Sequence, residues 1–223
     1  DLKSRTSFNG KMKDGSQYRG LEDWVLQFYG HRIEHDVDGS IKAIYYPETK
    51  DGKIVGYKSR HLPKRFGIGN LGATGADNDL SGMHKFPNGG RFVIIVGGEE
   101  DKVAAQQMFR EYQISKNQSD YDHYAVVSPT SGENSAAKQC AKHYDWLDKF
   151  DNIIVCMDND DAGRKASVEL VKVLPKDKVK VMSLSGKDPN QMLLDGKQKQ
   201  FISNFWDAKE SVHSGIFNSI ESS

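Results

Sequence analysis

The chain has 223 residues, enough for one large domain or two small ones, and its 31 Lys and Arg residues balance 31 Asp and Glu residues, so net charge identifies no partner. The mean hydropathy is -0.66 and no apolar run approaches the ~20 residues that a membrane-spanning helix needs, which excludes an integral membrane protein. Its 10 Phe, 9 Tyr and 3 Trp exclude a wholly disordered chain, and its two cysteines exclude a disulfide framework or a cysteine-rich zinc site, so we expect a soluble protein from a reducing compartment.

Charge is unevenly divided along the chain. Residues 1–75 carry 13 Lys and Arg against 9 Asp and Glu, and the remainder carries 18 against 22. The basic excess is concentrated in residues 50–65, where Asp51 is the single acidic residue. Surface lysines of this kind are commonly just solvated, but a local basic patch also suits phosphate groups.

The N-terminal part has the pattern of short strands and turns. Residues 41–46 and 54–60 are apolar and β-prone, and the dipeptides Asp38-Gly39 and Asp51-Gly52 beside them are common in hairpin turns. They predict a small antiparallel sheet. Residues 67–90 are rich in Gly, Asn and Asp and predict a long irregular connection.

Beyond residue 92 strand and helix patterns alternate. Continuous β-prone runs occupy 92–96, 125–127, 153–157 and 179–184, and apolar residues at helical spacing follow the first three, the last of these helices being expected over 162–174. Such alternation predicts right-handed crossovers and a buried parallel sheet with helices on both faces. Functional residues then belong at the carboxyl ends of the strands.

Acidic residues follow three of these predicted strands. Asp158 and Asp160 come directly after 153–157, and the two-residue period of extended chain puts both carboxylates on one side, where they can share a divalent cation. Residues 99–101 follow the first strand and Asp188 follows the fourth. Each acid alone is explained as a helix cap, but three at one sheet edge repel unless a cation neutralises them, so we predict a metal site.

Two of these acidic segments resemble the signature motifs of a known family. Gly-Gly-Glu-Glu-Asp at 97–101 and Met-Asp-Asn-Asp-Asp-Ala-Gly-Arg-Lys-Ala at 157–166 resemble the motifs of the Toprim domain of primases and type IA and II topoisomerases. More narrowly, segments 58–66, 135–138, 173–175 and 187–188 make the chain similar to the primase half of bifunctional phage primase-helicases, whose helicase half is related to mitochondrial Twinkle.

This resemblance implies a fold and a domain division. The fold class is α/β: a Toprim domain with a central, mainly parallel four-stranded sheet flanked by helices, preceded by a small α+β N-terminal subdomain. Residues 1–86 would form the basic N-terminal subdomain of the RNA polymerase (primase) domain, 87–207 the Toprim metal-binding subdomain, and 208–223 a linker toward a helicase domain.

The resemblance also assigns site residues. Asp158 and Asp160 would be catalytic and would bridge two Mg²⁺ or Mn²⁺ ions, with Asp188 completing the acidic rim. Nucleotide or nucleic-acid contacts would come from four basic residues, Lys58, Arg60, Lys64 and Arg65. Three further residues, Gly98, Asp101 and Gly163, would support the motifs.

One position departs from the family motif, which is normally Glu-Gly-x-x-Asp. Gly97 stands where the motif has a Glu that serves as metal ligand or general base. Either the site is disabled, or Glu99 or Glu100 supplies the missing carboxylate from the following turn. We favour Glu99 as the catalytic and metal-binding substitute, because acidic compensation is expected around two divalent ions.

The implied activity is that of a DNA primase, which makes short RNA primers from ribonucleoside triphosphates on single-stranded DNA during phage replication in the host cytoplasm. Covalently linked zinc-binding and helicase domains would be partners in a longer chain, of which we expect this to be a monomeric fragment. The alternative is a catalytically degenerate Toprim module that binds single-stranded DNA, which Gly97 favours. A topoisomerase lacks an evident transesterifying tyrosine domain, and a Toprim nuclease would use the same ions.

Overall fold

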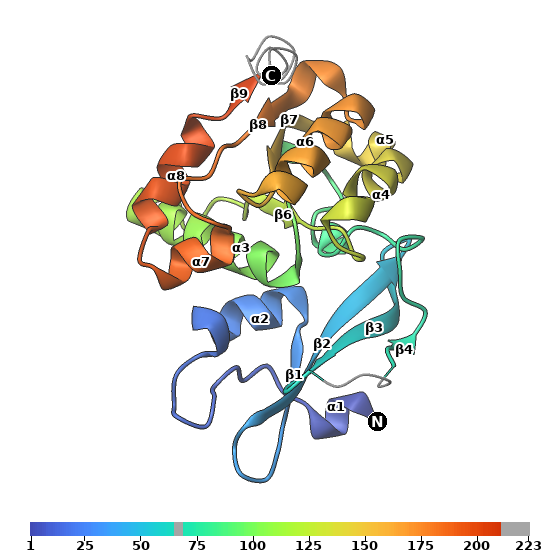
Figure 1. Ribbon diagram of the computed structural model, residues 1–223, viewed down its shortest axis with the longest axis vertical. Coiled ribbons are helices and arrows are strands. Elements are labelled where there is room, and N and C mark those ends of the chain that lie inside the picture. Colours follow the sequence, from blue (N-terminus) through green and yellow to red (C-terminus); the bar gives the residue numbers. More distant parts are fainter. Residues whose placement is uncertain (65–68, 211–223) are drawn as a thin grey trace.

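The computed structural model describes residues 1–64 and 69–210 and arranges them in two lobes (Figure 1). The lower lobe holds the N-terminal sheet, and the upper lobe holds a second sheet with most of the helices. Within the described ranges, no helix combines the length and the apolar character required to cross a bilayer.

The N-terminal lobe is built on an antiparallel sheet in the order β1-β2-β3-β4. Its elements are α1 (Leu2–Arg5), η1 (Tyr18–Gly20), α2 (Asp23–Tyr29), β1 (Arg32–His35), β2 (Ile41–Lys50), β3 (Lys53–His61) and β4 (Leu71–Gly72). Asp51 and Gly52, which join β2 to β3, both have positive φ, as the favoured two-residue hairpin turns require. The predicted hairpin is therefore confirmed.

The resemblance implies an α+β N-terminal subdomain, but the sequence pattern of strands and turns does not locate its helix α2. It ends at Gly30, whose φ of 74° is the left-handed conformation common after helices. Its buried face carries Val25, Leu26 and Tyr29, and the Tyr29 hydroxyl donates a hydrogen bond to the carbonyl of Val126 over 2.8 Å. The helix thus joins the lower lobe to the sheet of the upper lobe.

The upper lobe contains a five-stranded sheet in the order β6-β5-β7-β8-β9. Its elements, with the preceding turn, are η2 (Met83–Lys85), β5 (Gly90–Val96), α3 (Glu99–Ser115), β6 (Ala125–Val127), η3 (Glu133–Ser135), α4 (Ala136–Lys142), α5 (Tyr144–Leu147), β7 (Phe150–Cys156), α6 (Asp161–Val173), η4 (Lys176–Lys178), β8 (Val179–Val181), α7 (Pro189–Leu194), α8 (Gln198–Trp206) and β9 (Lys209–Glu210).

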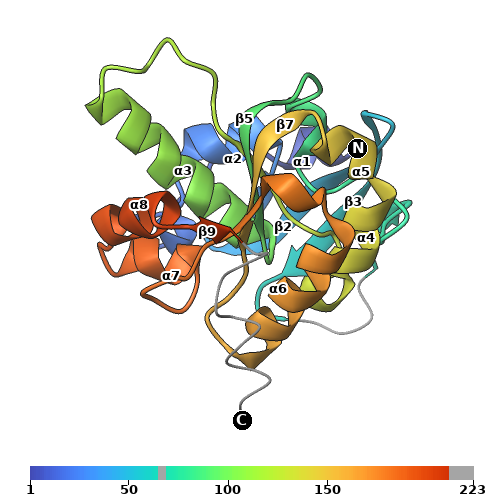
Figure 2. The same ribbon diagram turned by 90° about the horizontal axis from the view of Figure 1, so that it is seen from above.

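Successive residues of β5 serve two different cores, one on each face of this sheet. Ile94 and Val96 pack into the core beneath α3 and α8, whereas Val93 and Ile95 pack into the core beneath α4 and α6. Figure 2 shows α3, α7 and α8 on one side of the sheet and α4, α5 and α6 on the other. The four predicted strands are parallel neighbours, which confirms the α/β sheet flanked by helices.

The sheet also departs from the expectation at its far edge. The short strand β9 pairs antiparallel with β8, so the sheet has five strands rather than four. This strand lies inside the stretch from residue 208 that we expected to be a linker, and residues 211–223 are outside the described part. Helices α7 and α8 were not predicted either, and α4 and α5 are separated at His143.

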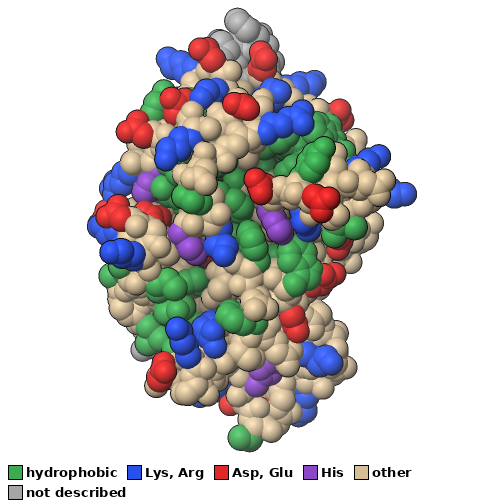
Figure 3. Space-filling model, turned by 180° about the vertical axis from the view of Figure 1, so that it is seen from behind, with side chains coloured by type: hydrophobic (Ala, Val, Ile, Leu, Met, Phe, Trp, Pro, Cys, Tyr) green, Lys and Arg blue, Asp and Glu red, His purple; other side chains and the backbone are tan. Residues whose placement is uncertain are grey.

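The molecular surface does not segregate charge by sign on the face opposite to Figure 1. Figure 3 shows acidic and basic side chains interspersed over the upper lobe of that face. The clustering of charge that concerns function is at the carboxyl edge of the second sheet.

Candidate functional site

Three aspartates meet at the carboxyl edge of the parallel sheet. Asp101 lies in the first turn of α3, Asp158 follows β7, and Asp188 caps the N-terminus of α7. One carboxylate oxygen from each residue lies within 4.8 Å of those from the other two. The structure therefore brings Asp158 and Asp188 together as predicted, and the third member is Asp101, which the motif comparison had given only a supporting role.

Hydrogen bonds between neighbouring loops hold these aspartates in place. The backbone N–H of Asn159 donates to the carbonyl of Lys187 over 2.8 Å, which ties the loop after β7 to the segment that carries Asp188. The backbone N–H of Asn190 donates to Oδ1 of Asp101 over 3.0 Å, and Oδ1 of Asp188 accepts from the N–H of Gln191 over 2.8 Å. The cluster is thus part of the fold's own hydrogen bonding.

Gly163 lets the first turn of α6 approach the chain at Asp158. A Cβ atom at Gly163 would lie 1.9 Å from the Asp158 carbonyl oxygen, which no side chain can tolerate. In the same turn Oδ1 of Asp160 accepts the N–H of Gly163 over 2.7 Å, an N-cap. Among the described residues, Asp160 is not one of the three convergent carboxylates, so the structure does not place it with Asp158 in this cluster.

The aspartate cluster carries strong mutual repulsion. Burial, together with the charges of Asp188 and Asp158, raises the pKa of Asp101. Burial, then Glu133 and Asp188, raise the pKa of Asp158 to about 7. In addition, Oδ1 of Asp158 is buried and has no hydrogen-bond partner among the described residues. Closely spaced carboxylate oxygens with an unsatisfied atom fit a hard divalent cation such as Mg²⁺ or Mn²⁺.

A fourth acid adjoins this cluster and was missed by the sequence analysis. Glu133 begins η3, in the segment that follows β6, and its Oε1 accepts the backbone N–H of Asp158 over 2.9 Å. Burial, Asp160 and Asp188 raise the pKa of Glu133. The signal that could have found it is the one used for the other strands, because Glu133 is an acid in the segment after the carboxyl end of a parallel strand.

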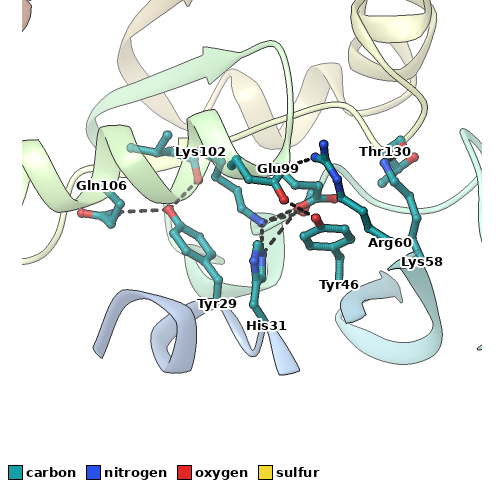
Figure 4. Close-up of polar contacts among 12 residues, drawn as sticks. Tyr29, His31, Tyr46, Lys58, Arg60, Glu99, Lys102, Gln106 and Thr130 are labelled. Carbon is teal, nitrogen blue, oxygen red and sulfur yellow. Dashed lines mark hydrogen bonds and ion pairs between the residues drawn. The ribbon is translucent and has the colours of Figure 1, made fainter. Parts of the chain in front are cut away.

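Glu99 lies elsewhere, in a buried ion pair. Its Oε2 is 2.9 Å from Nζ of Lys102 and 2.7 Å from the hydroxyl of Ser81, and His31 lies 3.6 Å away (Figure 4). Burial alone would raise the pKa of Glu99, but the Lys102 ammonium and His31 outweigh burial and hold this pKa well below its usual range.

This placement contradicts the expectation that Glu99 replaces the carboxylate missing at Gly97. The physical reason is the helix itself. Glu99 and Asp101 are two positions apart on α3, and at 3.6 residues per turn their side chains leave the helix on nearly opposite sides.

The predicted basic residues of β3 reach the same edge of the sheet. Nζ of Lys58 donates to the carbonyl of Thr130 over 2.9 Å, and Nη1 of Arg60 lies 3.6 Å from Oε2 of Glu100 (Figure 4). Glu100 also accepts from the hydroxyl of Tyr46. Glu100 is thereby engaged by β2 and β3, and it does not join the aspartate cluster either.

The other predicted residues are placed as follows. Gly98 is the N-cap residue of α3, and its Cβ position faces open space. Lys64 is exposed beyond the end of β3. Arg65 lies outside the described residues.

Comparison with known proteins supports one family throughout. The family model of Toprim-like domains matches residues 94–193, which include all three convergent aspartates. The chain is 30% identical to the DNA helicase/primase of Enterobacteria phage T3 over 213 residues, which are 95% of this chain and 34% of that protein. It therefore spans about a third of the length of this curated relative.

Comparison with solved structures supports the same family. The primase fragment of the bacteriophage T7 primase-helicase is 32% identical, with a TM-score of 0.71 over 89% of this chain and 75% of that fragment. Primase domains of phage T7 bound to an RNA/DNA hybrid and dTTP, in a complex with the lagging-strand DNA polymerase, are 32% identical, with a TM-score of 0.72 over 86% of this chain and 90% of that one.

A more distant primase, from Aquifex aeolicus, shares the fold at 16% identity and a TM-score of 0.62, over 91% of this chain and 58% of that one. The T7 primase fragment, by contrast, matches in sequence as well as in fold over most of its length. The chain therefore belongs to the family of Toprim-containing primase domains found in phage primase-helicases.

Proposed function

We propose that this chain is a DNA primase that joins ribonucleoside triphosphates into short RNA primers, directed by a single-stranded DNA template. The observation that carries the proposal is the convergence of Asp101, Asp158 and Asp188 at the carboxyl edge of the sheet, in a chain of this family. Nucleotidyl transfer requires little from protein side chains beyond positioning and the neutralisation of charge.

Asp101, Asp158 and Asp188 would hold the divalent ions, and we propose two Mg²⁺ or Mn²⁺ ions. When bound, such ions make a hydroxyl more acidic and neutralise charge on phosphate oxygens, the two requirements for attack by a primer 3′-hydroxyl and release of pyrophosphate. Asp160 keeps Oδ1 on the N-terminus of α6 and adds negative charge beside Asp158. This makes Asp160 a supporting residue in the proposal.

The substrate phosphates would meet the basic residues of the N-terminal lobe. Lys58 and Arg60 are fixed on β3 against the segment after β6 and the first turn of α3, the turn that also carries Asp101. Lys64 and Arg65 continue this basic stretch in the sequence. The related phage T7 primase domains were solved with an RNA/DNA hybrid and dTTP, which supports nucleic acid and nucleotide as ligands of this chain.

The chain would act in phage DNA replication, in the host cytoplasm, as one part of a larger protein. The phage T3 relative is a DNA helicase/primase. We propose the same covalent link to a helicase domain here, with a zinc-binding domain supplying template recognition.

A second candidate is a Toprim module that binds single-stranded DNA without catalysis. Gly97 favours it, because the family motif normally has a carboxylate there. In this case the aspartates would be remnants of a catalytic site, and the basic residues of β3 would keep their contacts with nucleic acid.

An assay of primer synthesis distinguishes the primase from the module that only binds DNA. Labelled ribonucleotides, a single-stranded template and Mg²⁺ or Mn²⁺ are supplied to the unaltered chain, to Asp158→Ala and to Asp177→Asn, an exposed acid in η4 that serves as the control. Products from the unaltered chain and the control, lost in Asp158→Ala, support the primase. No product from any of the three, with DNA binding intact, supports the binding module.

A further inference from the structure

The space beside Gly97, where a side chain would lie, is filled by the side chain of Glu133. A Cβ atom at this position would lie 2.5 Å from Oε1 of Glu133, 2.9 Å from its Cγ and 3.0 Å from its Cδ. The φ of Gly97 is outside the range that favours glycine, so its backbone does not require one. The space that a side chain at position 97 would need is occupied by the side chain of Glu133.

The strand order explains how Glu133 comes to lie there. Strand β5 lies between β6 and β7 in the sheet, Gly97 directly follows β5, and Glu133 is in the segment after β6. The Glu133 side chain crosses the end of β5 and accepts the backbone N–H of Asp158, after β7. A side chain at position 97 would push the Glu133 carboxylate out of this position.

Glu133 reaches a region of negative charge without a positive partner. Among residues 1–64 and 69–210, no Lys or Arg forms an ion pair with Glu133 or with Asp158. Neighbouring carboxylates without a basic partner are stable together when a cation is shared between them.

We propose that Glu133 supplies, across the end of β5, the metal-binding carboxylate that the chain lacks at Gly97. This proposal rests on the proposed function and deepens it. Glu133 and Asp158 would bind the same divalent ion. The carboxylate that the family motif places at position 97 would thus come from position 133, and Gly97 leaves room for it. The site is then complete rather than disabled.

Metal binding, measured apart from activity, tests this. Titration calorimetry with Mn²⁺ compares the unaltered chain, Glu133→Gln and Glu169→Gln, an exposed acid of α6 that pairs with Lys172. Glutamine retains the oxygen that accepts from Asp158, so a merely structural role would survive the change. We expect Mn²⁺ affinity about tenfold or more weaker in Glu133→Gln and unchanged in Glu169→Gln. Affinity within twofold of the unaltered chain would overturn the proposal.

Relocating the carboxylate provides a second test. Glu133→Ala should lose Mn²⁺ affinity, and Gly97→Glu/Glu133→Ala, which moves the acid to the motif position, should regain it. A double variant no better than Glu133→Ala counts against the proposal. Far-ultraviolet circular dichroism establishes that each variant is folded before titration.

Asp158→Asn distinguishes this inference from the proposed function. If Asp158→Asn loses Mn²⁺ binding while Glu133→Gln keeps it, Glu133 is not a ligand and the primase proposal stands. If the unaltered chain gives no Mn²⁺ heat and makes no primers, the primase proposal fails and this inference fails with it.

Discussion

The backbone N–H of Asn190 donates to Oδ1 of Asp101 across 3.0 Å, joining the start of α7 to the first turn of α3. This bond links two segments that are 89 residues apart and holds Asp188, two residues earlier, against Asp101. The fold therefore forces two carboxylates together, and the consequences of that repulsion can be measured.

Asp101→Asn should make the metal-free chain more stable and remove its response to metal. The amide keeps an oxygen for the Asn190 N–H and cannot ionise, so above the Asp101 pKa of about 8 the cluster carries one negative charge fewer and repulsion falls while the fold is kept. Thermal denaturation with and without Mn²⁺ measures both effects. Asp177→Asn is the control, and an Asp101→Asn chain that keeps the full metal-induced rise in Tm would contradict the role given to Asp101.

The stability of the metal-free chain should fall as pH rises through about 7. Asp158 has a pKa of about 7 in the folded chain and an ordinary value of about 4 when unfolded. Because the folded state binds this proton more tightly, its stabilising contribution is complete below the unfolded value and disappears above the folded one. Denaturation between about pH 5 and 7.5 is compared with that of Asp158→Asn, which should show a weaker decline. Equal slopes would mean that Asp158 does not titrate there.

Gly163→Ala should both destabilise the chain and weaken metal binding. The added methyl group would lie 1.9 Å from the Asp158 carbonyl, so the turn that presents Asp158 must move. Such overpacking costs about 3 kcal/mol in the free energy of unfolding. Urea denaturation and Mn²⁺ titration, with Glu169→Ala as the control on the same helix, measure the two effects. A fully stable variant with normal Mn²⁺ affinity would show that the turn has room.

Local sequence signals were sufficient for the main features of the fold. The alternation of β-prone runs with apolar helical stripes located four parallel strands, and Asp51-Gly52 located the long hairpin. Helix α7 has a recognisable start at Asp188 and Pro189, but it spans only 6 residues, too few to show a helical period of apolar residues. Strand β9 is two residues long and has no signal of its own.

At the candidate site, the sequence does not predict the direction in which each acidic side chain points. Sequence order places Glu99, Glu100 and Asp101 together, but the helix sends Glu99 to Lys102 and Asp101 to the cluster. Likewise, only the strand order brings Glu133 next to Gly97. Proximity along the chain favoured Glu99 as the substitute, and proximity in space favours Glu133.

Glu99→Gln should cost stability while leaving the metal affinity of the folded chain unchanged. The change leaves the Lys102 ammonium buried without its carboxylate, and breaking a buried ion pair costs about 3–5 kcal/mol. Urea denaturation measures the loss, and Mn²⁺ titration of the folded fraction at low temperature measures the affinity. A stable variant with Mn²⁺ affinity reduced tenfold would restore Glu99 as a ligand.

Arg60→Ala should weaken nucleotide binding more than it slows the chemical step. The Arg60 guanidinium is held beside Glu100, the residue before Asp101 in α3, and a charge-assisted contact with a phosphate is worth about 1.5–3 kcal/mol. The KM for ribonucleoside triphosphates should therefore rise about 10- to 100-fold, with a smaller change in kcat. Lys53→Ala, an exposed lysine at the start of the same strand, is the matched control and should leave KM unchanged. Steady-state primer synthesis at varied nucleotide concentration gives both constants. If kcat falls and KM does not, Arg60 acts through its contact with Glu100 on the first turn of α3, and the triphosphate is held by other residues.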